Sequence, residues 1–178
     1  MTQEPLNLAD LDIRRLKPND DVAEWRCGEE PWAEEVAEFL RDDAINQEAL
    51  GLNVTLVFVD RGQIAGFVAL LGGTLRKEDE PALADALDVG YSEFPCLKIG
   101  QFGVHADCHR VGLGAYMMEW LRIEARAMNV GFRFLSLHVR NDNGGARRFW
   151  TREGFWPIQS LSGSNYQFMV YDLYQSAS

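Results

Sequence analysis

Apolar residues recur along the chain with two periods, and each period predicts one kind of element. Alternating or continuous apolar runs predict strands over residues 11–16, 54–59, 64–71, 97–104 and 132–139, after Phe155, and over 166–174. Spacings of three and four predict helices from Pro31 to about Gln47, from near Gly112 to Met128, and over 144–152. This order of elements predicts one α/β domain with a mixed sheet, covering residues 1–178.

Glycines and turn residues divide these runs. Asp60–Gln63 is typical of a hairpin turn, and Gly72-Gly73 is expected to end the following strand. The segment 74–95 is expected to be mainly a loop over the substrate side, with a short helix around Leu83 and Leu87. Gly100 and Gly103 inside the central strand indicate a bulge, a close approach by a ligand, or tight packing against a helix.

The helix from residue 113 is expected to bury one face and expose the other. Glu119, Arg122 and Arg126 fall on the side expected to face solvent. The expected buried face consists of Tyr116, Met117, Trp120, Leu121, Ala127 and Met128.

Charge and cysteine content narrow the class of protein. The chain has 27 acidic against 17 basic residues, a net charge of −10, which argues against nucleic acid and anionic membranes as partners. Three cysteines without a C-x-x-C pair indicate free thiols in a reducing compartment. Residues 1–10 lack the features of a signal peptide, and no apolar run is long enough to span a membrane, so we expect a cytoplasmic protein.

A glycine-containing loop, residues 104–115, joins the central strand to the long helix. Free N–H groups at a helix N-terminus bind phosphate, and glycine lets the anion approach the backbone. The loop is not a P-loop, because no Gly-Lys-Ser/Thr follows, and it lacks the third glycine of a dinucleotide fingerprint, since Met117 stands there. A structural turn explains Gly112-x-Gly114 equally well when it is taken alone.

A second motif follows the next strand. It contains Asn143, Ala146, Phe149 and Gly154-Phe155 in order. Together with Gly112 and Gly114, this spacing resembles the GNAT superfamily of acetyl-CoA-dependent N-acetyltransferases over about residues 97–155. The resemblance implies a mixed, mostly antiparallel sheet of six to seven strands, flanked by helices, with a splay at the central parallel strands.

The resemblance implies that acetyl-CoA is the cofactor and assigns its binding residues. Phe102, Gly103 and Val104 would pair through their backbone with the pantetheine arm, and Asn143 would bond near its reactive end. Ala146 and Phe149 would pack beside the arm. The pyrophosphate would meet the backbone of His109, Arg110, Val111, Gly112, Leu113, Gly114 and Ala115. Arg140, Arg147, Arg148 and Arg152 either meet the cofactor's phosphates or form a solvated helix face.

Two positions depart from the family pattern. His109 replaces the usual Arg or Gln of the loop, which should matter little because the contacts there come from the backbone. Trp150 stands where the family usually has a tyrosine general acid, and an indole N–H does not donate a proton at neutral pH. Either another group or water protonates the leaving thiolate, or the chain is a weak enzyme. Tyr166 or Tyr171 is a candidate for the acid. Glu93 is the first candidate for the base, ahead of the loop acids Glu78, Asp79 and Glu80 and of Gln101, which could orient a water.

The acceptor is left open. The expected activity is direct acetyl transfer to a primary amine of a small molecule or peptide, and a homodimer is one option for the assembly. Cys27-Gly28-Glu29, Ile64-Ala65-Gly66-Phe67 and the strand from Pro95 resemble the acetyltransferase toxins of toxin–antitoxin pairs, which act on aminoacyl-tRNA. A catalytically weak acyl-CoA-binding module is the third alternative. His105, Asp107, Cys108 and His109 are too closely spaced to close a metal site alone, so no metal is expected.

Overall fold

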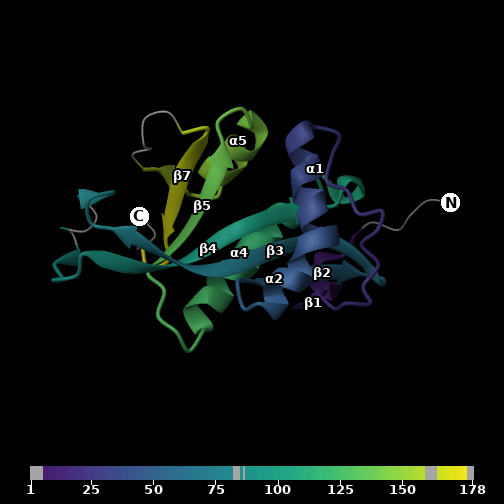
Figure 1. The fold of residues 1–178 in the computed structure, drawn as a ribbon, viewed down its shortest axis with the longest axis horizontal. Helices are drawn as coiled ribbons and strands as arrows, with labels where there is room; N and C mark the ends of the chain where they lie inside the picture. Colours follow the sequence, from purple (N-terminus) through teal and green to yellow (C-terminus); the bar gives the residue numbers. More distant parts are fainter. Residues whose placement is uncertain (1–5, 82–84, 86, 159–163, 176–178) are drawn as a thin grey trace. The chain divides into compact units, whose positions relative to one another are not determined.

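The computed structural model describes residues 6–81, 85, 87–158 and 164–175. It contains a seven-stranded sheet in the order β1-β2-β3-β4-β5-β7-β6, in which β4 and β5 are parallel and the other neighbours antiparallel (Figure 1). The mixed sheet and its flanking helices confirm the predicted fold class. The chain divides into two compact units, residues 1–71 with 100–120, and residues 72–99 with 121–178.

The first unit contains three antiparallel neighbours, of which β2 and β3 are joined by a short turn and β1 and β2 by a long helical connection. β1 (Asp12–Arg15) pairs with β2 (Val54–Asp60), which pairs with β3 (Gln63–Arg76). The turn between β2 and β3 places Arg61 (φ 48°) and Gly62 (φ 84°) in the left-handed region. Two consecutive left-handed residues match the twist of an antiparallel hairpin, so the predicted turn is confirmed.

One helical stretch precedes β2, and its first turn begins with a proline as predicted. It consists of α1 (Pro31–Glu38), a π-helical segment (Phe39–Asp43) and α2 (Ala44–Ala49). Its small and apolar side chains Ala33, Ala37 and Leu40 are each 1% exposed. They form one core cluster with Val57 and Phe67 from the strands beneath.

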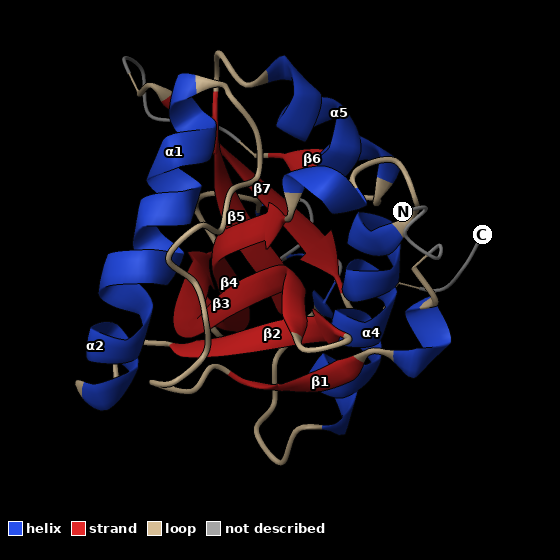
Figure 2. Cartoon of the chain, turned by 90° about the vertical axis from the view of Figure 1, so that its right-hand side faces the viewer, coloured by secondary structure: helices blue, strands red, loops and turns tan. Residues whose placement is uncertain are grey.

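The opposite face of these strands carries α4 (Leu113–Ala127). Phe58 points to this face and makes an edge contact with Trp120, with ring centroids 5.4 Å apart. Met117 packs against Gly66, where an added Cβ would lie 2.7 Å from its sulfur. Figure 2 shows α1 and α2 on one side of β2 and β3 and α4 on the other, so both faces of these strands are covered.

β4 (Glu93–Val104) contains an irregularity between its two glycines. A Cβ on Gly103 would meet Phe67, and a Cβ on Gly100 would meet Leu71. Phe67 and Leu71 lie four residues apart on β3 and so share a face, whereas positions 100 and 103 of a regular strand would point to opposite faces. One extra residue therefore interrupts the alternation between Gly100 and Gly103, so that both positions face the same side of the strand. This is the effect of a β-bulge.

The second unit is built around β5 (Phe134–Arg140), which pairs with β4 on one side and β7 (Tyr166–Asp172) on the other. β6 (Trp156–Pro157) adds to β7, and α5 (Gly144–Arg152) precedes it. Phe134 and Val170 face one core cluster together with Leu75 and Cys96. The other face meets Phe155, which packs on Tyr171 at 5.5 Å.

Three details of the sequence prediction were wrong. β3 does not stop at Gly72-Gly73 but continues to Arg76, and β4 begins at Glu93, so strands take up the two ends of the segment 74–95. The described residues between Arg76 and Glu93 lie outside any strand, as expected for a loop. Leu83 lies outside the described residues. Ala127 and Met128 are exposed because the buried face of α4 drifts to Leu113, Met117, Met118, Leu121 and Ala125. The Arg122 side chain is largely buried rather than solvated, since it pairs with Glu153.

Candidate cofactor-binding and active site

The loop from Val104 to Leu113 is held by a small set of backbone contacts in the first unit. The His105 N–H donates to Ala65 O at 2.8 Å, and the Ala106 N–H donates to Arg26 O at 2.9 Å. A single 3₁₀ turn, η3 (Ala106–Cys108), follows, and the His109 ring Nε2 lies 3.0 Å from Val104 O. The loop is thus anchored at its strand end before it turns into α4.

Two left-handed residues turn this loop into the helix. Arg110 has φ 63° and Gly112 has φ 85°. Glycine adopts this conformation without strain, while a non-glycine residue such as Arg110 adopts it only when its surroundings require it. Arg110, Val111 and Gly112 are exposed, and Leu113 is buried at 1% as the first residue of α4. The loop therefore presents backbone at a helix N-terminus to solvent, the arrangement that binds phosphate.

The strand before the loop is shaped by close packing. A Cβ on Gly103 would lie 2.7 Å from Trp25, 2.8 Å from Phe67 and 3.0 Å from Val36. Of the three explanations for the glycines, tight packing and a bulge are both present. A ligand's approach to Phe102, Gly103 and Val104 stays a prediction.

The second motif lies in the second unit at the start of α5. The Asn143 side chain accepts a hydrogen bond from the Ala146 N–H at 2.9 Å and so caps the helix. This is a structural use of the Asn-x-x-Ala spacing, which the family resemblance assigns to the cofactor. Ala146 and Phe149 are half-buried.

Trp150 is a core residue of the second unit. It is 6% exposed, and its ring meets Phe149 at 4.9 Å and Phe155 at 5.2 Å, both in edge contacts. The side chain at this position is therefore directed into an aromatic cluster.

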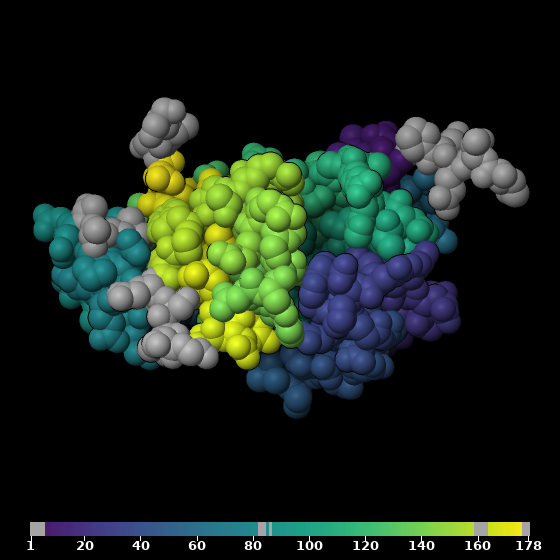
Figure 3. Space-filling view, turned by 90° about the horizontal axis from the view of Figure 1, so that it is seen from above, coloured from purple at the N-terminus to yellow at the C-terminus, as the bar shows by residue number. Residues whose placement is uncertain are grey.

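The arginines of α5 gather on its exposed side. Arg147, Arg148 and Arg152 are exposed, and Arg152 lies over the Phe149 ring at 5.6 Å. Arg140 instead pairs with Asp142 at 2.9 Å, and this contact holds the pKa of the Asp142 carboxyl below its usual range. Figure 3 shows α5, in light green, on the surface. Its outer side is thus a local basic surface in an acidic chain.

The acid–base candidates are spread through the second unit. Glu93 is the exposed first residue of β4, and Tyr166 is the 42% exposed first residue of β7, opposite Arg140. The paired stretch of β4 and β5 ends at Ile99 and Leu137. At about 3.3 Å per residue, Glu93 lies about 20 Å along the strand from that end.

Sequence reasoning missed His138, the first residue of β5 beyond this paired stretch. Its imidazole stacks on Phe168 with ring centroids 4.7 Å apart, on the face that also carries Lys98. Partial burial and, secondarily, the charge of Lys98 lower the pKa of His138 below its ordinary value, so the ring is neutral at pH 7. His138 is exposed within an otherwise largely buried strand, and a histidine alternating with the apolar residues Leu135, Leu137 and Val139 is its signal in the sequence.

The polar residues of the loop are engaged with the backbone. His105 Nδ1 accepts from the Asp107 N–H at 3.2 Å, and His109 contacts Val104 O as described above. Among the residues that the structure describes, no group of three or more His, Cys, Asp or Glu side chains could hold a metal ion.

Comparison with family models matches residues 19–155 to the Acetyltransferase (GNAT) family. The match covers more than half of the chain, and the protein belongs to this family of acyltransferases. A search of curated proteins gives no match.

Solved structures of low sequence identity share the fold. AtaT complexed with acetyl-methionyl-tRNAfMet has a TM-score of 0.69 and 21% identity, covering 89% of this chain and 94% of that one. A tyrosine-to-phenylalanine mutant of KacT has a TM-score of 0.70 and 20% identity, covering 92% and 95%. AtaTR bound with AcCoA has a TM-score of 0.66 and 22% identity, covering 90% and 93%. At these identities the likeness establishes the fold alone.

Two findings concern the expected partners, nucleic acid and membranes. One neighbour was solved with a tRNA and another, KacTA, with DNA, so the argument from net charge against nucleic acid is not supported for proteins of this fold. No helix among the described residues is both long enough and apolar enough to cross a membrane.

Proposed function

We propose that this chain is a single-domain, acetyl-CoA-dependent N-acetyltransferase that transfers acetyl directly to a primary amine. One observation carries the proposal: within a GNAT family match, left-handed Arg110 and Gly112 turn an exposed loop into the N-terminus of α4. That loop has the geometry and partial positive charge that a pyrophosphate requires. The presence of free, unbridged cysteines agrees with a cytoplasmic location.

Binding roles follow the family resemblance for each unit separately. In the first unit, the backbone of residues 109–115 would bind the pyrophosphate, and that of Phe102, Gly103 and Val104 would bond the pantetheine arm, with the Val104 N–H as the candidate donor to the thioester carbonyl. In the second unit, Ala146 and Phe149 would pack beside the arm, and the Asn143 amide nitrogen remains to donate a bond while its oxygen caps α5.

The bound cofactor supplies an activated acetyl thioester. The amine acceptor must lose a proton before it attacks, and His138 is the best-placed base, because a neutral imidazole lies at the residue where the parallel pairing ends. The protonated acceptor would give one proton to His138, which would pass it to solvent. On bonding to the acetyl carbon with cleavage of the carbon–sulfur bond, the nitrogen would lose its second proton, directly or through water, and this proton would replace the one that Tyr166 or water gives to the thiolate. The products are one amide, one thiol and one released proton.

The remaining catalytic candidates fit this scheme less well. Glu93 lies about 20 Å from the end of the paired stretch and is too distant to act there. The buried ring of Trp150 supports the aromatic cluster instead of donating a proton.

A second candidate acceptor is aminoacyl-tRNA. Exposed Arg147, Arg148 and Arg152 on α5 favour it, because nucleic acid affinity comes mainly from cations that meet phosphate. AtaT, solved with an acetylated methionyl-tRNA, provides the analogy of fold. A catalytically weak acyl-CoA-binding module is the third candidate.

The three candidates separate in one assay that measures thiol release from acetyl-CoA. Turnover with small amines or peptides but not with aminoacyl-tRNA supports the first, and the reverse supports the second. Tight acetyl-CoA binding with no turnover on either class supports the third and contradicts the proposed enzyme.

A further inference from the structure

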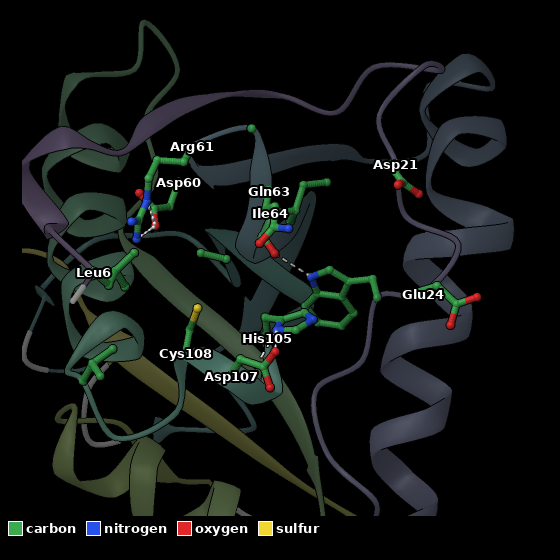
Figure 4. Close-up of a pocket in the computed structure, with 14 residues that line it drawn as sticks. Leu6, Asp21, Glu24, Asp60, Arg61, Gln63, Ile64, His105, Asp107 and Cys108 are labelled. Carbon is green, nitrogen blue, oxygen red and sulfur yellow. Dashed lines mark hydrogen bonds and ion pairs between the residues drawn. The ribbon is translucent and has the colours of Figure 1, made fainter. Parts of the chain in front are cut away.

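The first unit contains a cavity that the proposed reaction does not use. Its volume is about 680 Å³, and it lies between the β2–β3 turn, the loop before α1 and the segment that begins at His105 (Figure 4). Small-molecule sites commonly have volumes of about 300–1,000 Å³. The cavity is therefore large enough for a small organic ligand or for a long side chain of a partner.

Part of the cavity wall is apolar and rigid. Trp25, Ile64 and Ala65 line it and are only 4%, 6% and 3% exposed. The Trp25 indole N–H donates to Ile64 O at 2.9 Å, and its ring meets Phe67 edge-on at 5.1 Å. Because these side chains are fixed by other contacts, this wall exists before any ligand arrives.

The rest of the wall carries a net negative charge. Four carboxylates line the cavity, Asp21, Glu24, Asp60 and Asp107, against one guanidinium, Arg61. Figure 4 shows Asp21 and Glu24 on one side of the cavity and the Asp60–Arg61 pair on the other. His105 adds no positive charge at neutral pH, since partial burial lowers its pKa.

Two of the four carboxylates are already neutralised locally. Asp60 contacts Arg61 at 2.8 Å, and Asp107 contacts Arg26 at 3.4 Å. Asp21 and Glu24 form no ion pair with any residue in the described parts of the chain. They are the side chains available to a ligand.

We propose that this cavity binds an alkylguanidinium or alkylammonium group, with the cation beside Asp21 and Glu24 and its aliphatic stem against the Trp25 wall. An aliphatic stem with a terminal cation matches a cavity that is apolar on one wall and anionic on another. The same charge repels phosphate, which separates this site from the cofactor loop although Val111 borders both. Two sources share this chemistry, a free small cation and the Arg or Lys side chain of a peptide.

Titration of the whole protein with n-butylguanidinium, followed by backbone amide NMR shifts, tests the proposal. This probe has no primary amine to acetylate and the experiment contains no acetyl-CoA, so its result is independent of the proposed enzyme. We expect saturable shifts at Gly62, Gln63 and Ala65, weakening as salt is raised. Neutral n-butylurea, which has the same shape, should leave these signals unchanged. Equal binding of the urea, or no saturable shift with the guanidinium, overturns the proposal.

Variants locate the cation. Asp21→Asn/Glu24→Gln should weaken n-butylguanidinium binding about tenfold, as expected for two exposed ion pairs. Glu38→Gln/Asp43→Asn removes the same charges from exposed positions of the same unit outside the cavity, and should change binding less than about twofold. If both double variants weaken binding equally, general charge and not the cavity is responsible, and the proposal is wrong. Gln63→Trp, at an exposed lining position, should block binding with every carboxylate retained.

The peptide acetyl-Gly-Arg-Gly-amide distinguishes the two sources. Binding tighter than n-butylguanidinium, and equally sensitive to Asp21→Asn/Glu24→Gln, identifies a basic peptide segment as the occupant. Binding of n-butylguanidinium without the peptide identifies a free small cation. Binding of neither contradicts the site.

Discussion

Arg122 of α4 donates to Glu153 twice, to its backbone carbonyl at 2.6 Å and to its carboxylate at 3.1 Å. Both side chains are largely buried, with 12% and 9% exposed. Glu153 is the C-cap residue of α5, where free carbonyls and the negative end of the helix dipole favour a cation. The contact therefore fixes the end of α5 opposite to its Asn143 cap.

Arg122→Ala should lower the free energy of unfolding by about 3 kcal/mol, because it leaves a buried carboxylate and a carbonyl without their donor. Glu153→Ala should cost less, since the backbone carbonyl keeps its bond. Urea denaturation measures both, and Arg152→Ala on the exposed side of α5 is the control. Equal small effects of Arg122→Ala and Arg152→Ala would show that the buried pair adds nothing.

Gly103 tests the packing of the bulged strand. Gly103→Ala should destabilise the protein by about 1–3 kcal/mol, because its Cβ would overlap Trp25, Phe67 and Val36. Gly131→Ala is the matched control, since no atom lies within 4 Å of a Cβ there. Thermal or urea unfolding of the two variants gives the comparison, and a neutral Gly103→Ala would contradict the close packing described for this strand.

Asp20 should contribute stability that depends on pH. Two hydrogen bonds of 2.8 Å from Arg14, and one from the Lys17 N–H, hold the pKa of its carboxyl below the usual 3.8. The depressed pKa means that this stability is fully present above the unfolded-state pKa and is lost as pH falls through the folded-state value. Asp20→Asn should therefore cost about 1–2 kcal/mol at pH 7 and progressively less below about pH 4.

Asp12→Asn is the control for Asp20, because Asp12 contacts the same Arg14 side chain at 3.2 Å but is 67% exposed. Its loss should cost less than about 0.5 kcal/mol at any pH. Urea titrations at pH 7 and pH 3 make the measurement. A constant effect of Asp20→Asn across pH would be the contrary result.

The proposed role of His138 as the base predicts how kcat/KM depends on pH on the acidic side. Since the neutral imidazole is the active form and its pKa is lowered, kcat/KM should rise with pH through an inflection below 6.5. His138→Gln should remove this inflection and lower kcat about 100-fold. Phe168→Leu removes the stacked ring and should move the inflection upward, because less burial lets the pKa rise. An unchanged profile in His138→Gln would exclude His138 from proton transfer.

Much of the fold could be predicted from local sequence patterns. The hairpin turn at Arg61-Gly62, the start of α4 at Leu113 and the full extent of α5 follow from turn chemistry, capping and periodicity, which act over a few residues. The continuation of β3 through Gly72 and Gly73 was not predictable in this way, because it depends on pairing with a neighbouring strand.

The same distinction applies to the candidate site. The glycine loop and the helix after it could be predicted from the sequence, since both depend on residues close together in the chain. The burial of Trp150, the pairing of Arg122 with Glu153 and the stacking of His138 on Phe168 join residues distant in the chain. Their partners become visible only once the strands are in register.

Calorimetry with acetyl-CoA tests the central claim most directly, using a matched pair of variants at Gly114 in the first turn of α4. Gly114→Asp and Gly114→Asn add side chains of nearly equal size, and the carboxylate also favours the helix N-terminus, so loss of folding does not account for a difference between them. The unmodified protein should bind acetyl-CoA at micromolar concentrations, Gly114→Asn should retain binding, and Gly114→Asp should abolish it by repelling the pyrophosphate. No binding by the unmodified protein, or equal binding by Gly114→Asp, would contradict the assignment of this loop.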